Sequence, residues 1–177
     1  MPTSRPHALT HICSKIIDLN PKRVLDVGIG HGKFGFLTRE YTDVWRGTYY
    51  SQPNKFITET IIDGIEVHET YIGKMQREIY DDIHIGNALT ILPKLRKYDL
   101  IICCAVLEHF NKADGHTLLT LIKQKCEHAL ITVPVSFVPQ KAVYGNSYEI
   151  HLAHWECFEL SKYGQVHTLG RMRLLEI

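Results

Sequence analysis

A short apolar run followed by a glycine-rich turn is the feature that most restricts how this chain can fold. Residues 24–35 read VLDVGIGHGKFG, with four glycines in the eight positions from Gly28 to Gly35. Glycine adopts positive φ readily and lacks Cβ, so the backbone can turn sharply and bring its amides against a ligand. The segment predicts a buried strand, a tight turn and a helix. Both a dinucleotide and an adenosyl group fit such a turn.

Strand-like and helix-like patterns alternate along the rest of the chain. We expect strands at 23–28, 60–67, 82–86, 98–106, 129–135, 165–170 and 171–177, and helices at 4–19, 33–41, 72–79, 89–95, 111–126 and 155–163. This alternation predicts an α/β fold, a doubly wound and mostly parallel sheet of about seven strands with helices on both faces. The last two strands, joined tightly at Gly170 and Arg171, are expected to form an antiparallel pair at the sheet edge.

Length, charge and cysteine content limit the classes of protein to which this chain can belong. The 177 residues are expected to form a single domain, 1–177, and the formal net charge of +1 gives no general attraction to nucleic acid or an anionic membrane. No apolar stretch is long enough to span a bilayer or to serve as a signal peptide, so we expect a cytoplasmic protein. The five cysteines form no CxxC pair, which indicates reduced and mostly buried thiols.

Two long segments interrupt the alternation. Residues 41–59 are rich in aromatic side chains, and residues 136–154 contain two histidines and a glutamate. Loops of this length are uncommon unless they are functional lids or partly disordered. The aromatic residues of the first segment can cover a substrate, pack on the sheet edge or make a homodimer contact, and the three interpretations stay open. They are Trp45, Tyr49, Tyr50 and Phe56.

Four motifs, in chain order, resemble those of the class I, Rossmann-like S-adenosylmethionine-dependent methyltransferases. The motifs are LDVGIGHG at the first turn, DGIEV at the second strand, GNA after the third, and YDLIICCAVLEHF at the fourth. They span nearly the whole chain. The family often has Gly-Asp-Ala where this chain has GNA, which is a mild departure. The later segment PQKAVYGNSYEIHLAHW is also similar to one in small, mostly uncharacterised bacterial methyltransferases.

The resemblance implies S-adenosylmethionine as the cofactor. Asp26 occupies the acidic position before the turn, where a carboxylate suits a cationic ligand. Glu66 would accept both ribose hydroxyl protons, and the amide oxygen of Asn87 would accept the adenine amino group. The backbone near Cys104 would contact the methionine part. The full expected cofactor set is Asp26, Gly28, Gly30, His31, Gly32, Glu66, Val67, Asn87, Ala88, Cys104 and Ala105.

The candidates for the acceptor side of the site are histidines and their neighbours. His109 follows the fourth strand and is the first candidate for a general base, because its ordinary pKa suits proton uptake at neutral pH. A histidine that orders the loop is the competing interpretation. His151 is the second catalytic candidate. The other expected residues of the acceptor pocket are Tyr144, Glu149, His154 and Trp155, although Trp155 can equally be a buried residue at the start of the last helix.

Two histidines near the end of the second long segment suggest a possible metal site. His151 and His154 lie three residues apart and would share a helix face, with Glu149 or Cys157 as a further ligand. No second ligand pair with a recognisable spacing appears, so we expect no metal.

Three functions compete. The first is methyl transfer from S-adenosylmethionine to a small-molecule acceptor, or to a group on a larger carrier. The second is an inactive methyltransferase-fold module that serves a partner protein. The third, a nicotinamide oxidoreductase, is disfavoured by Asp26 and by a gap from the glycines to Glu66 longer than the usual ~20 residues. Nucleic acid is a minority expectation. Replacing Asp26 or Glu66 by alanine is expected to abolish cofactor binding while the fold survives.

Overall fold

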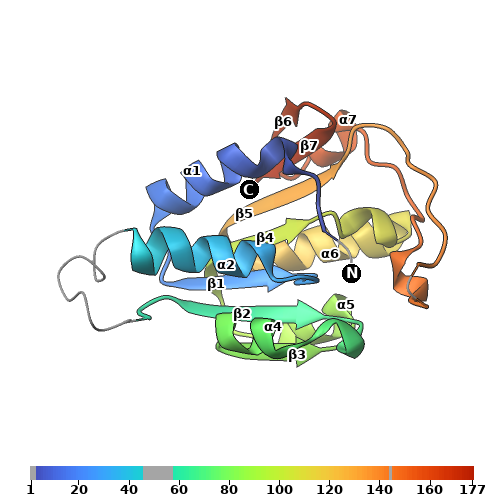
Figure 1. Ribbon diagram of the computed structural model, residues 1–177. Helices are drawn as coiled ribbons and strands as arrows, with labels where there is room; N and C mark the ends of the chain where they lie inside the picture. The colour runs from blue at the N-terminus through green and yellow to red at the C-terminus, as the bar shows by residue number, and fades with distance from the viewer. Residues whose placement is uncertain (1–2, 46–57, 144) are drawn as a thin grey trace.

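A seven-stranded sheet in the order β3-β2-β1-β4-β5-β7-β6 forms the centre of the protein (Figure 1). The computed structural model describes residues 3–45, 58–143 and 145–177. The strands are β1 Arg23–Val27, β2 Ile61–Glu66, β3 Asp82–Ile85, β4 Tyr98–Cys104, β5 Cys126–Pro134, β6 Gln165–Leu169 and β7 Met172–Glu176. The first five strands are parallel to one another, and β7 is antiparallel to both of its neighbours.

The strand order changes direction between β1 and β4. From β1 the chain adds β2 and β3 on one side, and then crosses back to place β4 and β5 on the other. Asp26 in β1 pairs with Gly64 in β2 and with Ile102 in β4, so the carboxyl ends of these three strands lie together. In open parallel sheets of this kind the crevice at such a point holds the ligand.

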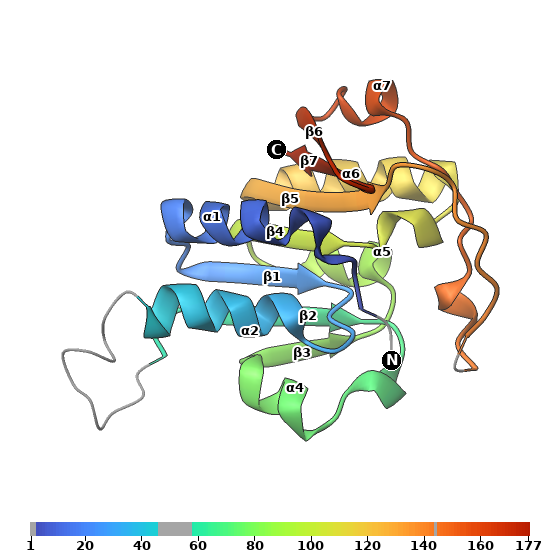
Figure 2. The ribbon, with the colours of Figure 1, turned by 45° about the horizontal axis from the view of Figure 1, so that its top comes forward.

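Helices cover both faces of the sheet, and Figure 2 shows the two layers. The helices are α1 Leu9–Leu19, α2 Lys33–Arg39, α4 Lys74–Ile79, α5 Ala88–Ile91, α6 Lys112–Lys125 and α7 Cys157–Leu160. Leu100 and Ile102 of β4 pack in a core with α1 and α2, whereas Ile101 and Cys103 pack in a second core with α5 and α6. This alternation follows from the two-residue period of a strand that is buried on both faces.

The expected sheet is confirmed, and the structure refines three boundaries. Within the antiparallel hairpin, β6 is the outer strand and β7 lies between it and β5. The first helix begins only at Leu9, because a 3₁₀ turn, Pro6–Ala8, precedes it. The last helix is a single turn from Cys157, because residues 151–156 run without helical structure.

The two long segments have different outcomes. Trp45 follows a π-helical turn, Glu40–Val44, that extends α2, and its side chain is exposed. Tyr49, Tyr50 and Phe56 lie outside the described residues, so the three interpretations of residues 41–59 stay open. Among the helices of the described residues, none has both the length and the apolar character needed to cross a bilayer.

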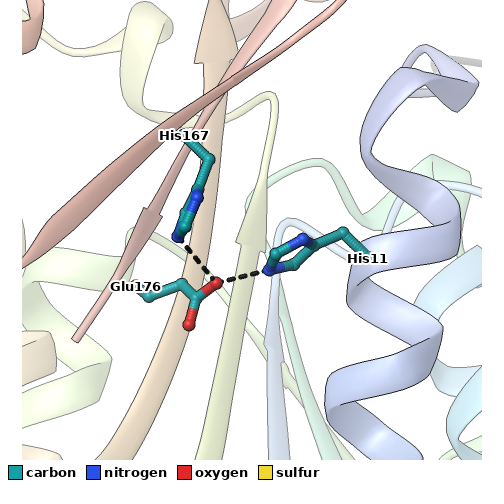
Figure 3. A group of neighbouring side chains, drawn as sticks. All are labelled: His11, His167 and Glu176. Atoms are coloured by element: carbon teal, nitrogen blue, oxygen red, sulfur yellow. Dashed lines mark hydrogen bonds and ion pairs between the residues drawn. The ribbon is translucent and has the colours of Figure 1, made fainter.

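One carboxylate ties α1 to the C-terminal hairpin (Figure 3). His11 of α1 contacts Oε1 of Glu176 through Nε2, and Nε2 of His167 on β6 lies 3.1 Å from the same oxygen. Lys15 Nζ lies 2.7 Å from the other oxygen, Oε2. Burial raises the pKa of Glu176, but the contacts from Lys15 and His11 outweigh burial and leave it below its ordinary value. The carboxylate therefore stabilises the docking of α1.

We expect Glu176→Gln to lower the free energy of unfolding by about 1 kcal/mol at pH 7, because the ion pairs are partly buried. A lowered pKa stabilises the fold above the unfolded value near ~4.3, and that contribution is lost as the pH falls through the folded value. Urea unfolding should thus show a smaller difference in the free energy of unfolding between wild type and Glu176→Gln at pH 4 than at pH 7. The control is Glu59→Gln, whose pair with Lys22 is more than half exposed. A difference independent of pH would contradict the expectation.

Candidate functional site

A cavity of about 650 Å³ opens at the carboxyl ends of β1, β2 and β4. Its wall combines the glycine turn, the ends of these strands, the start of α5 and the segment after β5. The sequence-predicted residues in the wall are Gly28, Gly30, His31, Glu66, Val67, Asn87, Ala88, Cys104, Ala105, His109, Glu149 and His151. The chain therefore brings most of the predicted cofactor set and both catalytic candidates into one cavity.

The glycine turn after β1 fits closely against its neighbours. Gly28 has φ +77°, and a Cβ there would lie 2.4 Å from Cγ2 of Val106. Any larger residue would be strained in its backbone and would collide with the turn after β4. Across the cavity, Ala105 also has positive φ, +56°, although it is not a glycine. Strained backbone of this kind persists where the surrounding structure holds it in place, and it clusters at functional sites.

Glu66 at the end of β2 holds the turn in place. Its Oε2 accepts the amide of Gly30 at 2.9 Å, and its Oε1 accepts the amide of His68 at 3.0 Å. The side chain lines the cavity and is nearly fully buried. Burial raises its pKa, against the lowering effect of these backbone hydrogen bonds. Each carboxylate oxygen has a second lone pair, so Glu66 can still accept from a ligand hydroxyl.

Asn87 lines the cavity at the start of α5. Its Oδ1 accepts the amide of Leu89 at 2.9 Å and so caps the helix. The sequence predicts that this same amide oxygen accepts a hydrogen bond from the adenine amino group. In the structure it already accepts one from the end of the helix. This local role follows from a common pattern, since asparagine is favoured at helix N-termini.

Asp26 does not lie in the cavity wall. It is buried behind the glycine turn, where its Oδ2 accepts the hydroxyl of Tyr80 at 2.6 Å. The expected contribution of Asp26 to cofactor binding stays a prediction. Tyr80 also accepts the amide of Gly35, so the pair joins β1 to the start of α2 and orders the turn. Gly32, the other residue of the expected cofactor set outside the wall, caps the amino end of α2 with φ +85°.

Burial raises the pKa of Asp26 to about 7, against the hydrogen bond from Tyr80. A raised pKa stabilises the fold below the unfolded value near ~4, and that stability is lost as the pH rises through about 7. We expect the wild type to lose roughly 2–4 kcal/mol relative to Asp26→Asn between pH 4 and pH 7. Urea unfolding across this range measures the difference. Parallel curves for the two proteins would contradict a buried, titrating carboxyl.

The turn after β4 and the segment after β5 meet at one end of the cavity. Glu108 and His109, of the 3₁₀ turn Leu107–His109, and His151 all line the wall there. The amides of Leu152 and Ala153 both donate to the backbone carbonyl of Glu108, at 2.8 and 3.2 Å. These bonds fix the later segment against the earlier turn. We call Glu108, His109 and His151 the acceptor-end cluster.

The acceptor-end cluster is largely desolvated. Burial raises the pKa of Glu108 to about 8. Burial also lowers the pKa of His109, so its ring is neutral at pH 7. The Nδ1 atom of His109 lies 3.1 Å from the carbonyl of Ile150, and that of His151 lies 2.6 Å from the carbonyl of Val138. From the sequence, Glu108 is expected to pack or pair near the cofactor and not to act in the chemistry. Its burial depends on the distant segment, which no local pattern indicates.

Glu149 belongs to the cavity wall as expected. Its Oε1 accepts the hydroxyl of Tyr71 at 3.1 Å, and Gln140 Nε2 donates to its backbone carbonyl at 2.7 Å. Asn146 donates to the same Tyr71 hydroxyl at 3.3 Å. Glu149 and Asn146 therefore bond the segment after β5 to Tyr71 on the opposite part of the chain, and the role of residues 136–154 as a lid stays a prediction.

Two other expected pocket residues do not join the cavity. Trp155 is fully buried, and its Nε1 donates to the carbonyl of Leu107 at 3.2 Å, so the interpretation as a core residue holds. His154 lies outside the cavity wall and pairs with Glu156 at 2.9 Å. Since residues 151–156 are not helical, His151 and His154 do not share a helix face, and the metal arrangement weighed from their spacing is wrong. Tyr144 lies outside the described residues.

The cysteines carry no reactive thiol at the cavity. All five are free, and burial raises the pKa of the Cys103 and Cys104 thiols far above their ordinary value. A thiol held in its protonated form is a poor nucleophile, so Cys104 lines the cavity without a chemical role.

Sequence reasoning missed the N-terminal contribution to the cavity. Thr3, Ser4 and Arg5 line its mouth, where Lys33 of α2 donates to the carbonyl of Ser4 at 2.5 Å. No local pattern marks this contact, because it depends on where the chain before α1 passes over the turn.

Two groups of described residues bring three metal-ligating atoms within 4.8 Å of one another. One is the acceptor-end cluster, and the other is His11, His167 and Glu176, which lie between α1 and the β6–β7 hairpin (Figure 3).

No family model and no curated protein matches the chain. Solved structures match it over nearly its whole length. An O-methyltransferase family protein from Burkholderia thailandensis superposes with a TM-score of 0.61 at 11% identity, covering 97% of this chain and 56% of that one. The methyltransferase domain of bacterial CtHen1-CN gives 0.62 at 15% identity and covers 97% of both chains.

The chain has the fold of the class I S-adenosylmethionine-dependent methyltransferases. Magnesium protoporphyrin IX methyltransferase (ChlM) from Synechocystis PCC 6803, determined with bound SAH, superposes with a TM-score of 0.58 at 15% identity over 96% of this chain and 82% of that one. This chain covers 97% of the CtHen1 domain but only 56% of the Burkholderia protein. It therefore spans about half the length of the Burkholderia protein. At these identities the likeness concerns the fold.

Proposed function

We propose that this chain transfers a methyl group from S-adenosylmethionine to a small-molecule acceptor. One observation carries the proposal. A single cavity joins the Glu66 and glycine-turn end, which suits an adenosyl group, to an acceptor end with buried titratable side chains. ChlM and EvdMO1, two proteins with the same fold, were determined with SAH, the demethylated product of that cofactor.

The residues present fit the cofactor. The cavity volume of about 650 Å³ lies in the range of ~300–1,000 Å³ usual for small-molecule sites. Glu66 offers carboxylate lone pairs where a ribose would lie, and the glycine turn lets the backbone approach closely. Each oxygen of Glu66 accepts one backbone amide and keeps a second lone pair, so the buried carboxylate can also accept from ligand hydroxyl groups.

S-adenosylmethionine, when bound, supplies a methyl carbon that is already activated by a sulfonium leaving group. The chain has to align the acceptor with that carbon and to exclude water. The segment after β5 and the residues before α1 build walls for this purpose. At the acceptor end, the neutral ring of His109 offers a lone pair toward an acceptor proton.

The inactive binding module is the competing proposal, and the acceptor-end cluster argues against it. A module that only holds the cofactor has no need for a buried glutamate and two histidines beyond the cofactor end of the cavity. Burial of such groups lowers stability unless they are paired, so their presence favours a second ligand.

We expect Glu66→Ala to weaken SAH binding about 10- to 100-fold, since hydrogen bonds to a charged group contribute about 1.5–3 kcal/mol each. Isothermal titration calorimetry with SAH and with S-adenosylmethionine measures the change. Glu69→Ala is the matched control, because that exposed glutamate lies three residues further on and outside the cavity wall. Circular dichroism checks the fold of both variants. Unchanged affinity in Glu66→Ala would place the adenosyl group elsewhere.

Transfer itself is tested with a methyl-labelled donor and fractionated metabolite extracts. We expect label to enter the low-mass fraction with the wild type and to decrease with Glu66→Ala. Binding of SAH without transfer to any fraction would instead support the inactive module.

A further inference from the structure

Among the residues that the structure describes, one carboxyl oxygen of Glu108 has no hydrogen-bond partner. Glu108 is only 3% exposed and lines the cavity, and its Oε2 makes no hydrogen bond within residues 3–45, 58–143 and 145–177. Burying a carboxylate without a partner is costly, so such an atom requires an explanation. Because it lies in a cavity wall, the simplest explanation is a ligand that binds there.

The histidines beside Glu108 are held in one orientation. Nδ1 of His109 and Nδ1 of His151 each lie against a backbone carbonyl, at 3.1 and 2.6 Å. A carbonyl only accepts hydrogen bonds, so each Nδ1 carries the proton and each Nε2 keeps a lone pair. Metal-binding histidines usually have this arrangement, since a hydrogen bond from one nitrogen fixes the ring while the other binds the ion.

The three side chains also converge. One ligand atom from each of Glu108, His109 and His151 lies within 4.8 Å of the other two, and the two imidazole centroids are 4.8 Å apart. We propose that Glu108, His109 and His151 bind one divalent transition-metal cation at the acceptor end of the cavity. Two imidazoles and one carboxylate are a donor set that suits Zn²⁺ and its neighbours.

Three protein ligands leave a coordination position for a substrate oxygen. If the proposed methyl transfer holds, this site favours an acceptor with a hydroxyl group, because a cation lowers the pKa of an oxygen that it contacts. With the free nitrogen of His109 bound to the cation, the hydroxyl proton leaves to solvent instead of to His109, the oxygen forms a bond to the methyl carbon, and the carbon–sulfur bond breaks with its electron pair going to sulfur. This step rests on the proposed function, whereas the metal site itself does not.

The second group of three potential ligands does not offer the same site. In that group, His11 and His167 contact one oxygen of Glu176, and the ammonium group of Lys15 lies 2.7 Å from the other oxygen. A bound cation would be repelled by this ammonium group. Glu176 is also already paired, whereas Oε2 of Glu108 is not.

Metal binding is tested on the full chain after dialysis against a chelator. We expect Co²⁺ to bind with one ion per chain and to produce a visible d–d absorption band, and Zn²⁺ to displace it in calorimetry. Glu108→Gln and His151→Gln should each weaken Co²⁺ binding by at least 10- to 100-fold, the loss that follows removal of an outer-sphere partner. Thermal melting checks that both variants fold, and the second variant keeps the test valid if one does not.

Two histidine variants serve as matched controls. His154→Gln changes a histidine three residues from His151 and outside the cavity, and His11→Gln removes a ligand of the other cluster. Both should bind Co²⁺ as the wild type does. No binding by the wild type would overturn the proposal, as would loss of binding in His11→Gln with normal binding in Glu108→Gln.

Calorimetry with SAH separates this inference from the proposed function. Co²⁺ binding that depends on Glu108, in a chain that binds no SAH, would support the metal site and refute the methyltransferase. SAH binding and methyl transfer that persist unchanged after chelation would refute the metal-assisted step and leave the methyltransferase standing, whereas the metal site itself stands or falls with Co²⁺ binding. Label that enters hydroxyl compounds only with Zn²⁺ or Co²⁺ present would support both.

Discussion

The carboxylate of Glu66 is the contact on which the geometry of the site depends. It accepts the amide of Gly30 from the turn after β1 and the amide of His68 after its own strand. One buried side chain thus fixes two neighbouring strand ends relative to each other. The turn needs such an anchor, because its glycines have wide conformational freedom when nothing holds them. With the turn fixed, the close contact of Gly28 with Val106 sets the position of the loop after β4.

Buried acids at this edge of the sheet share one electrostatic consequence. Burial raises the pKa of Asp26 to about 7, that of Glu108 to about 8, and that of Glu66 above its ordinary value. Of these three acids, Glu66 and Glu108 line the cavity, and each would gain from a nearby positive charge, since desolvation opposes ionisation and a cation favours it. A sulfonium cofactor and a metal ion are both cationic, so the two proposals draw on the same property of the cavity.

Local patterns predicted the parts of the fold that local physics determines. The apolar strands, the glycine turn and the order of helices could be predicted because strand burial and positive φ leave a clear mark in adjacent residues. The position of Asp26 could not, because its partner Tyr80 is 54 residues away. The burial of Trp155 likewise depends on the carbonyl of Leu107, 48 residues earlier. A tertiary contact determines the position of each of these two side chains. The neighbouring residues in the sequence do not indicate which contact forms.

The acceptor end shows the same limit in its chemistry. His109 and His151 were each predicted separately, but their relation to Glu108 depends on the backbone bonds from Leu152 and Ala153 to the carbonyl of Glu108. Those bonds place the later segment over the turn after β4 and so shield the glutamate from water. Glu108 thus anchors the segment through its backbone carbonyl, and the segment in turn buries the side chain of Glu108. The spacing of His151 and His154 would bring these two side chains together only in a helix, and residues 151–156 are not helical. The fold selects its ligand atoms across the cavity, where two strand-end segments meet.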